Sequence, residues 1–109
     1  MAFSEEKIWQ IWDKAYQITI SDAPMWRKDE CGAWIRRIDY ENPGSQYGWV
    51  ADYITPESEG GSDDISNLRP LQWENILREK DGSLECPVIA SGTENVKRDK
   101  SMRNFNNFD

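Results

Sequence analysis

The 109-residue chain contains no histidine, and this absence excludes several kinds of chemistry. A Ser-His-Asp triad, a Cys-His pair, a histidine general base and a histidine-ligated zinc site all need an imidazole. Cysteine is also scarce, since only Cys31 and Cys86 are present and no C-x-x-C spacing predicts a zinc ribbon or a redox motif. The two thiols allow one disulfide, which the sequence neither requires nor excludes.

Long apolar segments are missing as well. No stretch of the sequence approaches the roughly 18 apolar residues of a membrane span. The N-terminal sequence MAFSEEKIW has neither the basic nor the apolar region of a signal peptide. We therefore expect a cytoplasmic protein with reduced thiols and no membrane partner.

Basic residues are fewer than acidic ones. The chain has 13 Lys and Arg residues and 20 Asp and Glu residues, which give a net charge of −7. A chain of this sign repels a phosphate backbone, so direct DNA binding is not expected. Aromatic residues are plentiful, with six Trp, four Tyr and three Phe, and each can bury a large area. The length then predicts a single folded domain over residues 1–109.

A helix is predicted within residues 1–20. Ser4 is a suitable N-cap residue, and apolar side chains follow it at helical spacing until the pattern fades near Gln17. We expect Trp9, on this helix, and Trp26 to pack in the core, and a role in an interface is the alternative.

The sequence predicts four short strands, at residues 34–35, 47–54, 68–71 and 86–90. A second helix is predicted over residues 72–80, because Gly82 after it suits a helix C-cap. The core is expected within residues 25–90, and residues 91–109 are expected to form a polar, partly flexible tail. This order of elements predicts an α+β fold with an N-terminal helix and a central strand–loop–strand–helix unit.

The centre of the chain contains several short sequence blocks that match one family pattern in the same order. They are Cys31-Gly32-Ala33-Trp34-Ile35, the run from Tyr47 to Ile54, Pro56, the run from Gly60 to Asp64, the run from Asn67 to Leu71, and Trp73-Glu74-Asn75. Together they resemble the HNH endonuclease family, most closely its small bacterial and phage members. The resemblance implies a ββα-metal fold, in which a catalytic loop lies between two strands and a helix packs behind them.

The chain departs from the family pattern at the positions that carry the chemistry. The resemblance places a histidine that activates water where this chain has Tyr53, directly after Asp52. A phenol has a reference pKa near 10, so it is a poor general base at neutral pH. The middle family position corresponds to Asn67, and the last metal-ligand position falls on Ile76, which has no lone pair for a metal. The resemblance thus implies a degenerate member with vestigial positions and no catalytic residue.

A continuous acidic segment surrounds these vestigial positions. Between Ile38 and Leu68 the sequence has seven acidic residues and no Lys or Arg. Besides Asp52, they are Asp39, Glu41, Glu57, Glu59, Asp63 and Asp64. A surface of this sign favours a partner with a basic surface. The simpler alternative is a solvated acidic segment that maintains solubility.

The family resemblance and the acidic segment allow three functions. The first is a binding or inhibitory module without a cofactor, whose acidic face docks on a CRISPR or other defence nuclease or on its RNA complex. Small acidic proteins of phages and mobile elements that block such enzymes follow this charge logic.

The second is a residual nuclease that uses Mg²⁺ or Mn²⁺, with Asp52 and Asn75 as the ligands and Asn67 in its family position. The third is a non-catalytic nucleic-acid-binding protein. Its cations would be Arg36, Arg37, Arg69, Arg78, Lys97 and Arg98.

Overall fold

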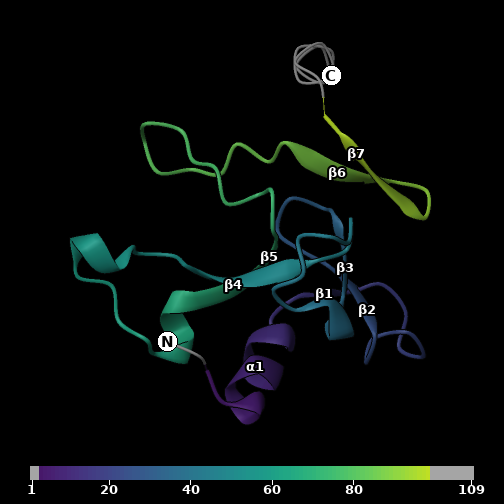
Figure 1. Cartoon of the computed structure of the whole chain (residues 1–109), viewed down its shortest axis with the longest axis horizontal. Coiled ribbons are helices and arrows are strands. Elements are labelled where there is room, and N and C mark those ends of the chain that lie inside the picture. Colours follow the sequence, from purple (N-terminus) through teal and green to yellow (C-terminus); the bar gives the residue numbers. More distant parts are fainter. Residues whose placement is uncertain (1–2, 99–109) are drawn as a thin grey trace.

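The computed structural model describes residues 3–98, which form one helix and several short antiparallel strands (Figure 1). The helix and strands are α1 (Glu5–Trp12), β1 (Tyr16–Gln17), β2 (Trp26–Lys28), β3 (Trp34–Arg36), β4 (Trp49–Tyr53), β5 (Leu68–Gln72), β6 (Val88–Ser91) and β7 (Glu94–Lys97). Three single 3₁₀ turns complete the list: η1 (Arg37–Asp39), η2 (Glu57–Glu59) and η3 (Ile65–Asn67). The mixture of one helix with antiparallel sheets confirms the predicted α+β class.

The strands form three separate antiparallel sheets. One contains β1, β2 and β3 in that order, and the other two are the hairpins β4–β5 and β6–β7. In the β4–β5 hairpin Asp52 lies opposite Arg69, and Tyr53 lies opposite Leu68. α1 packs against β5 and η3. No helix within residues 3–98 is long and apolar enough to cross a membrane.

A small aromatic and aliphatic core joins α1 to the first two sheets. Its buried members are Ile8, Ile11, Trp12, Ala15, Ile35, Trp49 and Leu68. The rings of Trp12 and Trp49 are fully buried, with their centroids 5.3 Å apart. Two indoles bury a large apolar area, which compensates for the low aliphatic content of the chain.

α1 begins as the sequence predicts and ends earlier. The Ser4 hydroxyl accepts a hydrogen bond from the Lys7 backbone N–H at 3.1 Å, which confirms Ser4 as the N-cap. The helix stops at Trp12, whereas the sequence predicts an end near Gln17. Tyr16 and Gln17 leave the helical path because they pair with β2, so sheet pairing overrides the local helical pattern.

The second predicted helix, over residues 72–80, does not form. Gln72 belongs to β5, residues 73–76 form a turn, and Arg78 forms an isolated β-bridge with Leu84. The reason lies in Asn75, whose side chain is fully buried and bonded on both sides to the backbone of Val88. These bonds fix the turn and outweigh helix propensity.

The C-terminal part also differs from the prediction. Residues 91–98, which the sequence assigns to a polar tail, belong to a hairpin, because β6 and β7 pair with Ser91 opposite Glu94. The rest of the predicted tail, residues 99–109, lies outside the described residues.

A buried carboxylate links the β2–β3 turn to β5. Asp29 accepts four hydrogen bonds: at Oδ1 from the backbone N–H groups of Cys31 (3.0 Å) and Ala33 (2.9 Å), and at Oδ2 from the Gln72 backbone N–H and the Asn75 side-chain amide, both at 2.9 Å. Burial raises the pKa of Asp29, and these four bonds partly oppose that rise. Asp29 and Asn75 thus form one buried polar cluster whose members satisfy one another.

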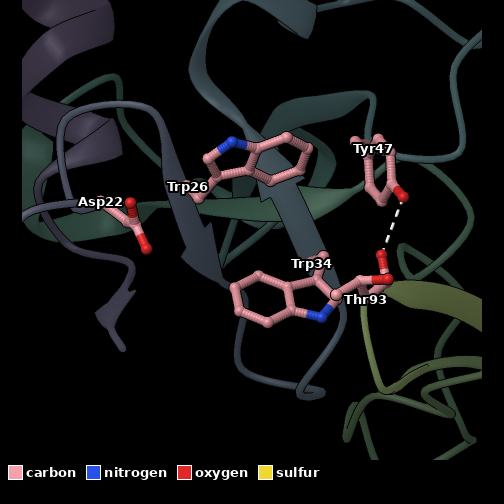
Figure 2. Close-up of a pocket in the computed structure, with 5 residues that line it drawn as sticks. All are labelled: Asp22, Trp26, Trp34, Tyr47 and Thr93. Carbon is pink, nitrogen blue, oxygen red and sulfur yellow. Dashed lines mark hydrogen bonds between the residues drawn. The ribbon is translucent and has the colours of Figure 1, made fainter. Parts of the chain in front are cut away.

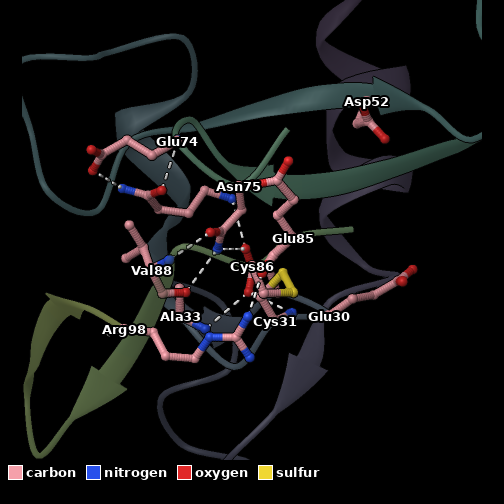
Figure 3. The surroundings of a disulfide bond; sticks show 12 residues. Glu30, Cys31, Ala33, Asp52, Glu74, Asn75, Glu85, Cys86, Val88 and Arg98 are labelled. Atoms are coloured by element: carbon pink, nitrogen blue, oxygen red, sulfur yellow. Dashed lines mark hydrogen bonds between the residues drawn. A yellow bond between two sulfur atoms is a disulfide. The ribbon is translucent and has the colours of Figure 1, made fainter. Parts of the chain in front are cut away.

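Cys31 and Cys86 form a disulfide beside this cluster (Figure 3), with their Cα atoms 5.3 Å apart. The bond replaces the reduced thiols expected from the sequence. It closes a loop across 55 residues, which by loop-closure entropy stabilises the fold by about 4 kcal/mol.

The Asp29→Asn variant tests the buried polar cluster. An amide keeps one oxygen for Cys31 and Ala33, but it turns an N–H₂ group toward the donors of Gln72 and Asn75. We expect the free energy of unfolding, measured by urea denaturation, to fall by about 2 kcal/mol. The exposed control Asp64→Asn should change it by less than about 0.5 kcal/mol. Equal stabilities of the two variants would contradict this role of Asp29.

Candidate functional site

Asp52 is held between two arginines. Arg69 Nε and Arg78 Nη2 both donate to Asp52 Oδ2 at 2.9 Å, and the Asp52 side chain is only 10% exposed. Arg69 reaches it from the opposite strand of the β4–β5 hairpin and also pairs with Glu30 at 3.3 Å. The carboxylate that the HNH resemblance assigns to the active site is therefore neutralised by neighbouring guanidinium groups.

Tyr53, where the HNH resemblance expects a histidine, holds the loop that follows β4 in place. Its hydroxyl donates to Asp63 Oδ1 at 2.6 Å. This hydrogen bond is the main cause that raises the pKa of Tyr53 to about 12. The phenol therefore keeps its proton at neutral pH, so it cannot serve there as a general base.

Asn67 closes the neck of the same loop. Its Oδ1 accepts from the Thr55 backbone N–H at 2.8 Å, and its Nδ2 donates to the carbonyls of Thr55 (3.0 Å) and Ser62 (2.9 Å). Gly61 lets the two sides approach, because a Cβ there would lie 1.7 Å from the Thr55 oxygen. All three described hydrogen bonds of the Asn67 side chain therefore close the loop.

Ile76, the expected last metal-ligand position, and Asn75, the candidate ligand, do not lie with Asp52. Ile76 is 46% exposed, and the side chain of Asn75 is buried against Asp29 and Val88. Figure 3 shows Asp52 lying apart from Asn75. The structure thus does not bring together Asp52 and Asn75, the ligand pair of the residual-nuclease hypothesis. Within the described part of the chain, no group of three or more Cys, Asp or Glu side chains is placed to hold a metal ion.

The predicted acidic face is divided by the structure. Asp39 is only 5% exposed and accepts hydrogen bonds from Arg36 Nε at 2.9 Å and Ser45 Oγ at 2.8 Å, so it does not belong to the surface. Glu41 is exposed, but its backbone N–H bonds to Trp49, at the start of β4. Asp39 therefore does not belong to the expected acidic face. Glu41 lies beside the start of β4, at the other end of this strand from the remaining acidic residues.

The other four acidic residues lie together in the loop between β4 and β5, residues 54–67, which we name the acidic loop. They are Glu57, Glu59, Asp63 and Asp64, and all four are exposed. The loop extends to the left edge of the view in Figure 1. Lys7 and Lys14 of the N-terminal region donate to its backbone carbonyls at Asp63 and Ile65. The loop is therefore fixed through backbone carbonyls and the Asp63 carboxylate, which Tyr53 contacts, while Glu57, Glu59 and Asp64 are exposed.

The cations of the nucleic-acid-binding hypothesis are already engaged. Arg36 pairs with Asp39, Arg37 with Glu5, Arg69 and Arg78 with Asp52, Lys97 with Glu74, and Arg98 donates to the Glu85 carbonyl. Because each has a carboxylate or carbonyl partner, they do not form a free basic patch.

The structure also contains an aromatic pocket that the sequence does not predict. Figure 2 shows its lining residues, which are Asp22, Trp26, Trp34, Tyr47 and Thr93, around a cavity of about 330 Å³. Trp26 is half-buried and lines this pocket, so the expectation that it packs in the core is wrong. One sequence feature could have indicated this pocket. On each of the two neighbouring strands an aromatic residue is followed two positions later by a basic one, Trp26 by Lys28 and Trp34 by Arg36, and these residues face each other in the pairing.

Trp9 also departs from the expected core position. It is 40% exposed, and the Arg37 guanidinium lies over its ring at 4.2 Å from the centroid. The ring therefore covers a charged side chain at the surface and does not fill the interior.

Replacing Asp52 tests whether its carboxylate stabilises the fold. Asp52→Asn removes the carboxylate of the only ion pair described for Arg78 and leaves Arg69 with Glu30 alone, in a partly buried place, so we expect the free energy of unfolding to fall by about 3 kcal/mol. Urea denaturation at neutral pH measures it, with Asp64→Asn as the matched exposed control. A variant as stable as the parent protein would show that these ion pairs do not hold the hairpin.

The Tyr53 titration can be measured directly. Tyrosinate absorbance at 295 nm, compared between the parent and Tyr53→Phe, should assign to Tyr53 a pKa of about 12. Because the raised pKa belongs to the folded state, the stability it gives is present at neutral pH and is lost as the pH rises from about 10 toward that value. Asp63→Asn should return the pKa toward 10. A parent value below 10 would exclude the bond to Asp63.

We compared the chain with protein-family models, curated proteins and solved structures. No family model, no curated protein and no solved structure matches it.

Proposed function

We propose that this chain is a non-catalytic protein-binding module whose acidic loop docks on a basic surface of a partner protein. The observation that carries this proposal is the construction of the loop. Four exposed carboxylates stand on a segment without Lys or Arg, and that segment is closed at its neck by Asn67.

Preorganisation gives the loop an advantage as a binding element. The bonds of Asn67 to Thr55 and Ser62, and of Tyr53 to Asp63, order the loop before a partner arrives. A loop that is already ordered loses less conformational entropy on binding. Its charge also accelerates the encounter with a basic surface.

We propose further that the scaffold is a degenerate HNH-type unit. The sequence blocks and the antiparallel β4–β5 hairpin, with the loop between its strands, support this relation. The structure has a turn at residues 73–76 in place of the helix of that unit. In this scaffold the former catalytic positions, Asp52, Tyr53 and Asn67, maintain the shape of the hairpin and its loop.

The partner chemistry that fits best is the nucleic-acid channel of a defence nuclease, such as a CRISPR effector or a restriction enzyme. Such a channel is basic because it neutralises phosphates, and carboxylates can occupy the same places. This partner would position the chain in the cytoplasm, where the Cys31–Cys86 bond would meet a reducing environment.

Charge reversal in the loop tests the proposal. The double variant Glu57→Lys with Glu59→Lys leaves Asp63 on Tyr53, so the loop keeps its closure. Against a panel of purified CRISPR effector complexes and restriction endonucleases, we expect the parent to bind and inhibit at least one member. The association rate of the variant should be lower by about tenfold or more, measured by surface plasmon resonance at low and high salt.

The matched control reverses two exposed carboxylates elsewhere, Glu6→Lys with Glu41→Lys. Equal losses from both double variants would show that net charge, and not the acidic loop, determines binding. Absence of binding to the whole panel would reject the proposed partner class.

A cleavage assay tests the non-catalytic part. Supercoiled plasmid and RNA, incubated with the parent protein in Mg²⁺ or Mn²⁺, should remain intact. Cleavage that disappears in Asp52→Asn, with the folded fraction of the variant verified by circular dichroism, would instead support the residual nuclease.

A further inference from the structure

The aromatic pocket is built from three separate segments whose rings stand at right angles. Trp26 lies on β2, Trp34 on β3 and Tyr47 in the turn before β4. The Trp26 ring is inclined by 90° to Trp34, at a centroid distance of 6.3 Å, and by 86° to Tyr47, at 4.8 Å. The rings therefore form walls around the cavity (Figure 2) and are not stacked on one another.

Hydrogen bonds to the β6–β7 turn fix two of these walls. Trp34 Nε1 donates to the Gly92 carbonyl at 2.7 Å, and the Tyr47 hydroxyl donates to the Thr93 carbonyl at 2.8 Å. The polar atoms of both rings thus already have hydrogen-bond partners in the protein, and the apolar surfaces of the rings remain to line the cavity. A site formed in this way needs little reorganisation to accept a ligand.

The pocket also has a carboxylate at its side. Asp22 Oδ2 accepts a hydrogen bond from Thr19 Oγ1 at 2.9 Å, and its side chain is exposed. Throughout residues 3–98, no basic side chain forms an ion pair with Asp22. In Figure 2 it lies across the pocket from Tyr47. Three aromatic walls and one uncompensated carboxylate attract a positive charge.

The cations of this chain already show the affinity of these rings for positive charge. Lys28 Nζ lies 4.8 Å from the Trp34 centroid, and Arg36 Cζ lies 5.5 Å from the Trp26 centroid. Arg36 also lies 6.0 Å from the Tyr47 centroid, but it is neutralised by the buried Asp39. Among residues 3–98, Lys28 is therefore the cation at these rings that has no ion-pair partner and competes with a charged ligand. A phosphate-bearing ligand would be opposed by Asp22 and by the net charge of −7.

We propose that this pocket binds an organic cation with a methylated ammonium group, present either in a free quaternary amine or in a methylated lysine side chain of a protein. A cavity of about 330 Å³ is at the small end of ligand sites, which suits a trimethylammonium group with a short stem. The ring faces supply the attraction, and Asp22 supplies the counter-charge. None of the residues that line the pocket belongs to the acidic loop, residues 54–67, so this site is separate from the proposed docking loop.

The test compares a cation with its uncharged isostere. Calorimetric titration of the parent protein with choline and with 3,3-dimethylbutan-1-ol should show choline binding on the order of tenfold more tightly. A short peptide with a central trimethyl-lysine, and the same peptide with unmodified lysine, form the second arm. Preference for choline indicates a free amine as the source, and preference for the methylated peptide indicates a protein.

Variants locate the site. Asp22→Asn retains an oxygen acceptor for Thr19 and should weaken cation binding about threefold or more, whereas Asp64→Asn removes the same charge from the acidic loop and should not change it. Trp34→Leu should weaken binding about tenfold or more, with its fold verified by circular dichroism. Lys28→Gln removes the competing cation and should strengthen binding.

Three outcomes would overturn the proposal. One is equal binding of choline and its isostere, which would make the pocket a purely apolar site. Another is no binding of choline or of the methylated peptide. The third is cation binding that responds equally to Asp22→Asn and Asp64→Asn, which would reflect net charge alone.

Discussion

The buried contact between Asp29 and Asn75 is the constraint on which the rest of the structure depends. Asp29 gathers backbone donors from the β2–β3 turn and from β5, and Asn75 extends the cluster to β6 through Val88. Buried polar groups must find partners, so the chain around them has little freedom. The turn at residues 73–76 follows from this constraint, as does the position of the disulfide next to it.

The same constraint changes what the β4–β5 hairpin can do. Because Asn75 is used in the interior, it does not reach Asp52, and Asp52 is instead paired with Arg69 and Arg78. Tyr53 and Asn67 hold the acidic loop in the same way. Asp52, Tyr53 and Asn67, three of the positions that the HNH resemblance assigns to chemistry, thus each make structural contacts, and this arrangement supports the proposed binding function.

The sequence predicts local features of this fold well and long-range contacts poorly. The Ser4 cap, the α+β class and strands at β3, β4 and β5 follow from capping, periodicity and turn residues, all of which act over a few positions. The helix over residues 72–80 fails because the partners of the buried Asn75 side chain, Val88 and Asp29, are 13 and 46 positions away along the chain. The sequence also could not decide whether Cys31 and Cys86 pair, because they are 55 positions apart. At the candidate site, the sequence locates the acidic loop but cannot show that Asp39 is buried, and it gives only a weak strand periodicity for the aromatic pocket.

Paramagnetic relaxation by Mn²⁺ tests the proposal that Asp52 and Asn67 have structural roles and hold no metal. In a ¹⁵N-labelled sample, the side-chain Nε–Hε signals of Arg69 and Arg78 report on Asp52, which both guanidinium groups contact, and the side-chain amide signals of Asn67 report on the neck of the acidic loop. The structure predicts that low concentrations of Mn²⁺ broaden these signals no more than those of exposed carboxylate neighbours. Selective broadening of the Arg69, Arg78 and Asn67 signals, reversed by excess Mg²⁺, would contradict the account.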